Sequence, residues 1–181
     1  MSLYGASVEY GLHCLLYLVD PPEGVRPSSR DLAEFQGISP TFIAKLFTQL
    51  EKFGIVTASE GVRGGYRLAR PASAISVLDV ADALEGGKPM FQCREVRDSC
   101  VLYDASKVKT SKRGVCAIHA VMLEGERRMR EALAETSLAD IAGEVAGKQS
   151  ERLVAARRRW FEDRALSRRT SSRDAPTKKG D

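Results

Sequence analysis

The 181-residue sequence lacks the features that mark membrane, exported and enzymatic proteins. No stretch approaches the roughly 20 consecutive apolar residues that cross a bilayer. No basic stretch precedes an apolar one at the N-terminus, as a signal peptide requires. There is no HExxH motif, no nucleophile paired with a base, and no glycine-rich loop that leads into a helix. We therefore expect a cytoplasmic protein that is not an enzyme, with no membrane partner and no small-molecule substrate.

The sequence also lacks CxxC pairs, although three of its four cysteines are clustered. A reducing cytoplasm disfavours structural disulfides, so the cysteines are expected to be core residues, reactive thiols or metal ligands. Cys14 lies in a mostly apolar run and is predicted to be a core residue. Cys93, Cys100 and Cys116 lie in or beside a polar segment without a clear period, and His119 follows one helical turn after Cys116. Their wide spacings favour a site assembled from distant segments.

A second pair of ligand-type residues, Glu9 and His13, lies in the first predicted helix. Because they are four residues apart, they share a helix face. Imidazole and thiolate groups together suit zinc or iron–sulfur chemistry. From the residues alone, the Glu9 and His13 pair could equally be packed or solvated, and the cysteines could hold a metal or act as redox-active thiols.

Apolar residues at helical spacing predict a mainly α fold with a small β-hairpin. Ser29 is predicted to cap a helix that Gly37 ends, and Ser39 to cap a second helix with Pro40 at its first position. The apolar stripe of that second helix is expected to be Phe42, Ile43, Leu46, Phe47, Leu50 and Phe53. The predicted helices are 4–19, 30–36, 40–53, 76–85, 115–135 and a short one from Ser137, and the predicted strands lie near 55–58 and 66–69.

Two helices joined by a short turn and followed by a glycine-tipped hairpin predict a winged helix-turn-helix. In such a domain the second helix enters the major groove of DNA. Arg63, at the hairpin tip, is expected to enter a minor groove. The alternative is an amphipathic helical domain with a surface hairpin. The predicted DNA-contact residues are Ser29, Ser39, Thr41, Lys45, Gln49, Arg63, Gly64, Gly65 and Tyr66.

The C-terminal third of the chain combines a long apolar stripe with a basic end. The stripe, within 115–135, could pack on its own domain or pair with a second copy. Residues 147–181 hold 11 Lys/Arg and 5 Asp/Glu, a net charge of +6, whereas residues 1–146 have a net charge of −2. The basic end is expected to be either an arm that contacts phosphates or a solvated tail. The stripe consists of Ile118, Met122, Met129 and Leu133.

The segments DLAEFQGISPTFIAKLFTQLEKFGIV, GVRGGYRLARP, ISVLDVADALEG and CAIHA carry a family resemblance. Over roughly residues 3–146 the sequence resembles the bacterial Rrf-type winged-helix regulators, the family of IscR, NsrR and RsrR. The resemblance implies a homodimer that binds a double-stranded DNA operator. It divides the chain into a winged helix-turn-helix domain (1–86), a cluster-binding loop (87–116), a dimerisation helix with a short following helix (115–146), and a basic tail outside the pattern (147–181), helical and then disordered.

The resemblance also implies a cofactor. Many members hold an iron–sulfur cluster with three loop cysteines and a fourth ligand, here Cys93, Cys100, Cys116 and His119. The segments VEYGLHC, FQC and CAI look more like RsrR-type members. Those hold a 2Fe–2S cluster between subunits, which by position implies the ligands Glu9, His13, Cys93 and Cys116. The expected function is a transcriptional regulator that senses redox state, nitric oxide or iron through a 2Fe–2S cluster. The alternatives are a 4Fe–4S cluster, or a cluster-free regulator with a thiol switch or a zinc site.

Overall fold

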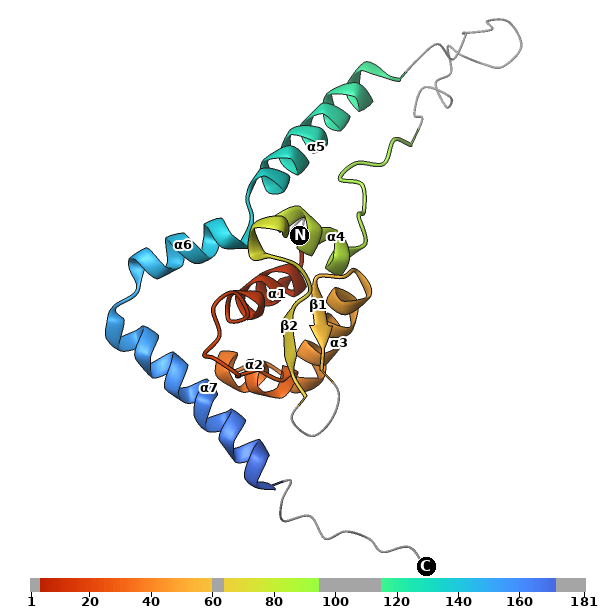
Figure 1. Cartoon of the computed structure of the whole chain (residues 1–181). Coiled ribbons are helices and arrows are strands. Elements are labelled where there is room, and N and C mark those ends of the chain that lie inside the picture. The colour runs from red at the N-terminus through yellow and green to blue at the C-terminus, as the bar shows by residue number, and fades with distance from the viewer. Residues whose placement is uncertain (1–3, 60–63, 95–114, 172–181) are drawn as a thin grey trace, which may run out of the picture. The chain divides into compact units, whose positions relative to one another are not determined.

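The computed structural model describes residues 4–59, 64–94 and 115–171 (Figure 1). The chain divides into two compact units, one formed by Met1–Gly87 with Leu133–Asp181 and the other by Lys88–Ala132. The described residues are mostly helical with one two-stranded antiparallel hairpin, which confirms the predicted fold class. No described helix has the length and apolar character needed to cross a membrane.

Helix α1 (Ala6–Leu16) packs closely on α4 (Val77–Glu85). A Cβ atom on Gly11 would lie 2.5 Å from Leu84 Cδ1, so glycine lets the two helices approach. The prediction that the helix continues to Val19 is wrong. After Leu16 the chain makes a tighter turn, in which the Leu18 amide donates to the Leu15 carbonyl at 2.9 Å, and Pro21 then follows.

Helix α2 (Ser29–Gln36) is capped by Ser28, so the prediction that Ser29 is the cap is wrong by one residue. The Ser28 hydroxyl accepts from the Asp31 amide at 3.2 Å, and the Asp31 carboxylate accepts from the Ser28 amide at 2.7 Å. This reciprocal pair satisfies two amides that the helix itself leaves unpaired. As predicted, Gly37 ends α2, in a left-handed conformation with φ 67°.

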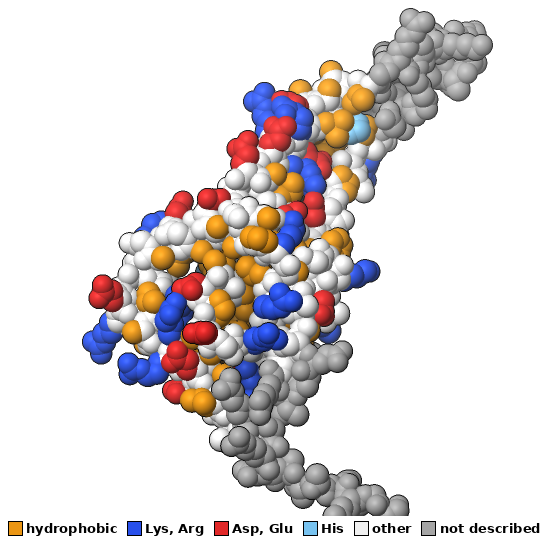
Figure 2. All heavy atoms as spheres, viewed as in Figure 1, with side chains coloured by type: hydrophobic (Ala, Val, Ile, Leu, Met, Phe, Trp, Pro, Cys, Tyr) orange, Lys and Arg blue, Asp and Glu red, His pale blue; other side chains and the backbone are white. Residues whose placement is uncertain are grey.

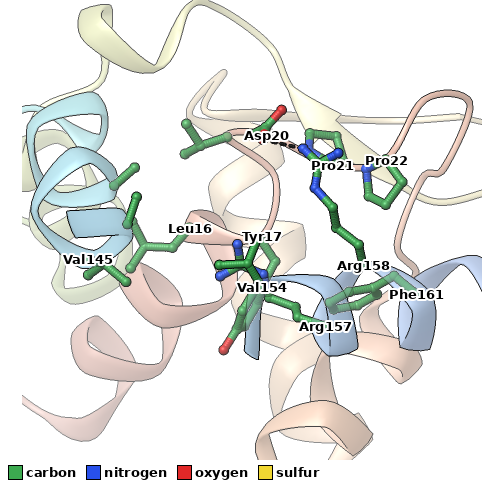
Figure 3. A pocket seen from close by; sticks show the side chains of 13 residues that line it. Leu16, Tyr17, Asp20, Pro21, Pro22, Val145, Val154, Arg157, Arg158 and Phe161 are labelled. Atoms are coloured by element: carbon green, nitrogen blue, oxygen red, sulfur yellow. Dashed lines mark hydrogen bonds and ion pairs between the residues drawn. The ribbon is translucent and has the colours of Figure 1, made fainter. Parts of the chain in front are cut away.

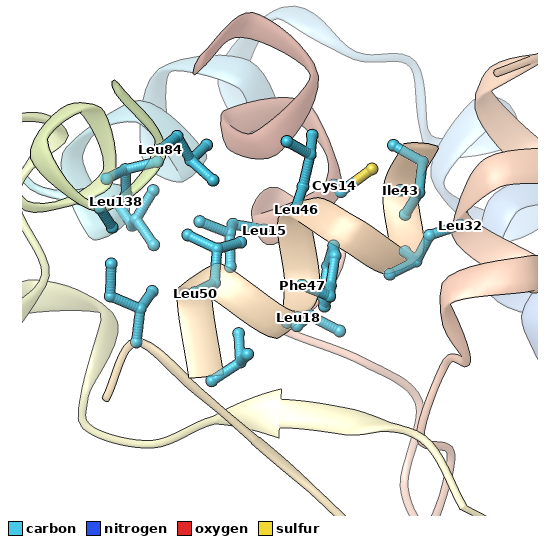
Figure 4. Close-up of a cluster of buried hydrophobic side chains, with 14 of the residues drawn as sticks. Cys14, Leu15, Leu18, Leu32, Ile43, Leu46, Phe47, Leu50, Leu84 and Leu138 are labelled. Atoms are coloured by element: carbon cyan, nitrogen blue, oxygen red, sulfur yellow. The ribbon is translucent and has the colours of Figure 1, made fainter. Parts of the chain in front are cut away.

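Helix α3 (Pro40–Lys52) begins with Pro40 at its first position, as predicted. Ser39 is its N-cap residue, but the serine side chain makes no capping hydrogen bond. Phe53 was expected in the buried stripe but is 55% exposed, because the helix ends at Lys52 and Gly54 (φ 67°) then turns the chain. The buried residues of α3 are Ile43, Leu46, Phe47 and Leu50, which pack with Leu15, Leu18, Leu32, Leu84 and Leu138 (Figure 4).

The hairpin consists of β1 (Val56–Ala58) and β2 (Tyr66–Leu68), close to the predicted strands. The strands are antiparallel, with Thr57 opposite Arg67. After a short 3₁₀ turn, Ala72–Ala74, Ser76 caps α4 through a reciprocal hydrogen-bond pair with Asp79. Gly86 ends α4 with φ 77°. The predicted bounds of this helix are therefore confirmed.

Helix α6 (Leu138–Lys148) joins the first unit through a short backbone bridge. The Leu138 amide donates to the Ile75 carbonyl at 2.9 Å, and the Val77 amide donates to the Thr136 carbonyl at 2.9 Å. Ser137, the predicted start of the helix, caps it with Asp140. The preceding helix, α5 (Ala117–Glu135), matches the long helix that was predicted.

The basic C-terminal region contains helix α7 (Glu151–Ser171), which is not a solvated tail over this range. Phe161 is only 3% exposed, and its ring lies 5.1 Å from Phe35 of α2 and 5.6 Å from Tyr17. A cavity of about 150 Å³ remains where α7 meets α6 and the end of α1, lined in part by Leu16, Val145 and Arg157 (Figure 3). Residues 172–181, expected to be disordered, lie outside the described residues.

Candidate nucleic-acid interface and metal ligands

The polar residues predicted to contact DNA lie on the exposed side of α3. Thr41, Lys45 and Gln49 are all exposed, at spacings of four residues that place them on one helix face. Thr48 is also exposed, but its hydroxyl donates to the Ala44 carbonyl at 3.0 Å. The N-terminal two turns of α3 therefore present a hydroxyl and an ammonium group to solvent.

The turn between α2 and α3 fixes the orientation of α3 relative to α2, and with it the direction of this polar face. The Ile38 amide donates to the Ala33 carbonyl at 2.9 Å, which completes the end of α2. Ser39 is exposed just before α3, and Ser29 is half-buried in the first turn of α2. Helices α2 and α3 pack directly on each other, in the helix-turn-helix arrangement that the sequence predicts.

The base of the hairpin is tied to the segment that precedes α2. The Tyr66 amide donates to the Pro27 carbonyl at 2.8 Å, and a Cβ on Gly65 would lie 2.1 Å from the Arg26 carbonyl oxygen. The Tyr66 ring packs on Phe47 at 4.7 Å. These two residues thus hold the wing on the domain, and Gly64 beside them is half-buried. Their contact with DNA stays a prediction, and Arg63 lies outside the described residues.

Two exposed arginines near this surface were not singled out from the sequence. Arg30 lies in the first turn of α2, and Arg67 lies in β2. The exposure of Arg67 could have been predicted from the sequence. Side chains alternate between the two faces of a strand, and Arg67 lies between the half-buried Tyr66 and Leu68. The exposure of Arg30 could also have been predicted, because side chains in the first turn of a helix commonly face solvent and Arg30 is the second residue of α2.

Glu9 and His13 belong to the first unit, and both side chains are exposed on α1. Their four-residue spacing places the carboxylate and the imidazole on the same face. Cys14, the next residue after His13, is fully buried in the core, and burial raises the pKa of its thiol to about 12. The prediction that Cys14 is a core residue is confirmed.

Cys93, Cys116 and His119 belong to the second unit, and all three are half-buried. The His119 ring lies 5.7 Å from Phe91, and the Met90 amide donates to Glu126 at 3.1 Å, so the segment before Cys93 contacts α5. Cys100 lies outside the described residues. Within the described ranges, no three His, Cys, Asp or Glu side chains are close enough together to hold a metal ion.

Comparison with known proteins identifies the family to which this fold belongs. The family model described as Rrf2, iron-dependent transcriptional regulator, matches residues 4–144. Rv1287 of Mycobacterium tuberculosis (strain H37Rv), named as an HTH-type transcriptional regulator, is 32% identical over 138 residues, which cover 76% of this chain and 80% of the relative. This chain belongs to the Rrf2 family of transcriptional regulators. The finer resemblance to RsrR-type members stays a prediction.

Solved structures share the Rrf2 fold with this chain at low sequence identity. CymR of B. subtilis, titled the global cysteine regulator, is 22% identical with a TM-score of 0.61, over 79% of this chain and 98% of that one. IscR of T. potens is 23% identical with a TM-score of 0.61, over 83% of this chain and 92% of that one. At these identities the similarity concerns the fold.

Helix α5 of this Rrf2 protein exposes much of its apolar surface within the described chain. Ile118 is 70% exposed and Val121 is 71% exposed, and α5 has no fully buried residue. In Figure 2, hydrophobic side chains lie at the surface among charged ones in the part of the chain that α5 occupies. Its charged side is internally paired, because Glu124 accepts from Arg127 and from Arg128 at 2.7 Å each. These arginines lower the pKa of Glu124 to about 2. The helix is therefore amphipathic, with an apolar side that its own unit leaves open to solvent.

Proposed function

We propose that this Rrf2-family regulator binds double-stranded operator DNA with α3 in the major groove. The observation that carries the proposal is the exposed polar face formed by Thr41, Lys45 and Gln49 on the second helix of the helix-turn-helix. Hydroxyl, ammonium and amide groups at such positions hydrogen-bond to base edges or phosphates. The Gly65 and Tyr66 contacts that anchor the wing support a second point of contact with the duplex.

The proposed DNA-binding form is a homodimer that pairs through α5. The exposed apolar side chains Ile118 and Val121 support this, since a partner would remove them from water. A dimer also presents two recognition helices to two half-sites about one helical turn apart. The expected operator is therefore pseudo-palindromic. Analytical ultracentrifugation of the full chain would detect a dimer, whereas a strict monomer at micromolar concentration would contradict this assembly.

We further propose that Glu9, His13, Cys93 and Cys116 hold a 2Fe–2S cluster, and that DNA affinity depends on its redox state. The donor chemistry fits: an exposed carboxylate and an exposed imidazole share one face of α1, and two half-buried thiols lie in the second unit. Such a cluster supplies one-electron chemistry, at a potential raised when imidazole replaces thiolate. Glu9 and His13 would bring its ligation into the same unit that carries α3.

Metal analysis of anaerobically purified protein tests the cluster and its ligands. The expected protein is coloured and contains iron and sulfide in equal amounts. His13→Ala should abolish the visible absorption, whereas His119→Ala, the matched control, and Cys100→Ala should retain it. Loss with Cys100→Ala and retention with His13→Ala would instead support the three-cysteine set, with its 4Fe–4S alternative.

A thiol switch is the competing proposal, and the fold neighbours include a structure titled the oxidised form of Staphylococcus aureus CymR. The described thiol Cys93 is partly accessible, which such a mechanism would require. A colourless protein whose DNA binding responds to peroxide and recovers with dithiothreitol would support it. A colourless protein with stoichiometric zinc would support the zinc alternative.

A further inference from the structure

The junction of α6, α7 and the end of α1, all within the first unit, leaves a cavity of about 150 Å³ (Figure 3). On α7 its lining residues recur at three- and four-residue spacing, which places them on one helix face: Val154, Arg157, Arg158 and Phe161. On α6 two of the three lining residues are alanines, Ala142 and Ala146, whose short side chains leave the space unfilled. Because the Rrf2 family match ends at residue 144, this cavity is built largely from residues beyond the match.

The walls of the cavity are mostly apolar. Leu16 contributes from the end of α1 and Val154 from α7, and Pro21 with Pro22 closes one side. A proline ring fixes the backbone angle φ, so that side has little conformational freedom. An apolar protein cavity of about 150 Å³ holds one benzene molecule. The space therefore suits a single aromatic ring rather than a nucleotide or a larger cofactor.

The charged residues that line the cavity carry a net charge of +1, from Arg157, Arg158 and Asp20. Arg158 contacts Asp20 at 2.5 Å, so these two charges compensate each other. In Figure 3 this pair lies beside Pro21 and Pro22. The remaining positive charge of the lining is therefore that of Arg157.

The Arg157 guanidinium has donors to spare. It donates to the Gln149 side-chain oxygen at 3.0 Å and lies over the Tyr17 ring, 5.8 Å from its centroid. Among the residues that the structure describes, no carboxylate forms an ion pair with it. A guanidinium carries five N–H donors and can bind a carboxylate through two parallel hydrogen bonds. Arg157 is thus suited to hold the carboxylate of a bound molecule.

We propose that this cavity binds a small monocarboxylate with one aromatic ring, of about the size of benzoate. Its ring lies among the apolar walls, and its carboxylate accepts hydrogen bonds from Arg157. The molecule is bound unchanged, as an effector rather than a substrate. None of the residues proposed to contact DNA or to hold a cluster lines the cavity, so the inference goes beyond the proposed function.

Two lining residues connect the cavity to α2, the first helix of the helix-turn-helix. The Phe161 ring lies 5.1 Å from Phe35, and the Tyr17 hydroxyl accepts a hydrogen bond from the Gln36 side chain at 3.0 Å. A ligand that binds only the docked arrangement of α7 stabilises that arrangement. Binding is therefore expected to raise the melting temperature of the protein.

Titration of the full chain with sodium benzoate at constant ionic strength tests the proposal. Trp160 reports on the site, because it is the sole tryptophan and its ring lies 4.9 Å from Phe161. Its fluorescence should change with a dissociation constant between about 10 μM and 1 mM. The melting temperature should rise with the benzoate concentration. Benzyl alcohol, which has the ring without the charge, should bind at least about tenfold more weakly.

Three variants separate the carboxylate contact from the cavity itself. Arg157→Gln should weaken benzoate binding by about 10- to 100-fold, and benzyl alcohol binding by less than about twofold. Arg159→Gln is the matched control, because Arg159 is exposed and lies outside the cavity, and it should bind benzoate as the unmodified chain does. Ala142→Leu fills the space and should abolish the binding of both molecules without lowering the melting temperature.

An unmodified chain that shows no saturable response to about 10 mM benzoate would overturn the proposal. So would equal benzoate affinity in the Arg157→Gln and Arg159→Gln variants, or full binding by Ala142→Leu. The assay contains no DNA, so its outcome is separate from that of the operator-binding experiments.

Discussion

Arg168 of α7 pairs with Asp31, the carboxylate that also caps the N-terminus of α2. Asp31 is the one buried charged residue among the described residues, at 5% exposure. Burial lowers the pKa of the Arg168 guanidinium, which remains charged at neutral pH because an arginine pKa starts so high. One carboxylate therefore links the start of α2 to a helix that follows it by more than 100 residues.

Breaking this pair is expected to destabilise the protein. Arg168→Ala should lower the free energy of unfolding by about 1 to 3 kcal/mol, because it leaves a buried carboxylate with fewer donors. Asp31→Ala should cost more, since it also removes a helix cap worth about 0.5 to 2 kcal/mol. Urea unfolding of the two single variants and the double variant measures the coupling energy between Arg168 and Asp31. The exposed Arg158–Asp20 pair is the control, with expected coupling of about 0 to 1 kcal/mol, and equal coupling in both pairs would contradict the special role of Asp31.

Phe161 is expected to contribute most of the apolar contact that docks α7. Phe161→Ala should lower the free energy of unfolding by about 3 to 5 kcal/mol, or by the whole docking energy if α7 detaches first. Trp160, the sole tryptophan of the chain, lies 5.0 Å from Phe35, so its fluorescence reports detachment. Leu166→Ala is the matched control, because Leu166 is 55% exposed. Similar losses for both variants would argue against a packed interface.

Two glycines should differ in their tolerance of a methyl group. A Cβ on Gly65 meets the Arg26 backbone carbonyl at 2.1 Å, whereas a Cβ on Gly11 meets the flexible end of Leu84 at 2.5 Å. Gly65→Ala is therefore expected to cost about 3 kcal/mol and Gly11→Ala about 1 kcal/mol. Thermal unfolding measures both. The reverse order would show that the wing can move away from the Arg26 carbonyl without loss.

The Cys14 thiol should be unreactive in the native protein. Its pKa is raised to about 12 by burial, so almost no thiolate forms at neutral pH. In cluster-free protein, iodoacetamide followed by mass spectrometry should label Cys93 well before Cys14. The raised pKa also favours folding below pH 9 and loses that advantage as the pH rises toward 12, so Cys14→Ala should weaken the alkaline loss of stability.

Lys45 is expected to contact DNA, whereas Lys52 at the other end of α3 is not. Both side chains are exposed, so neither substitution should destabilise the fold. Lys45→Ala should weaken operator binding by about 1 to 3 kcal/mol if the ammonium reads a base, or lower the salt slope by about 1 if it contacts a phosphate. Lys52→Ala is the control in the same assay. Indistinguishable binding by the two variants would remove Lys45 from the interface.

Local signals predicted most of the winged domain. Both ends of α4 and the start of α6 could be predicted from Ser76, Gly86 and Ser137, because caps depend on residues within one turn. The same logic, applied to the Asp three residues after Ser28, would have corrected the start of α2. Thr41 and Lys45 were placed on the exposed face of α3 because helical periodicity separates them from the buried stripe.

The docking of α7 could not be predicted in the same way. Its partners Asp20, Asp31 and Glu34 lie more than 100 residues earlier, and the arginine-rich composition of the segment is equally typical of a solvated helix. The adjacent aromatic residues Trp160 and Phe161, with Ala165 one turn later, were the local signal of a buried face. For the proposed cluster ligands, the spacing of Glu9 and His13 predicts that they share one face of α1. Residue spacing carries no information on which subunit supplies the two cysteine ligands.

The backbone bridge between Ser76 and Ser137 makes the intervening chain a closed excursion. The chain leaves the bridge at Ser76, continues through α4 and α5, and returns at Ser137 to pair with the residues it left. We therefore expect the segment between Gly87 and Leu133 to be exchangeable as a cassette, since grafting a relative's sequence there would leave both segments that form the bridge in place.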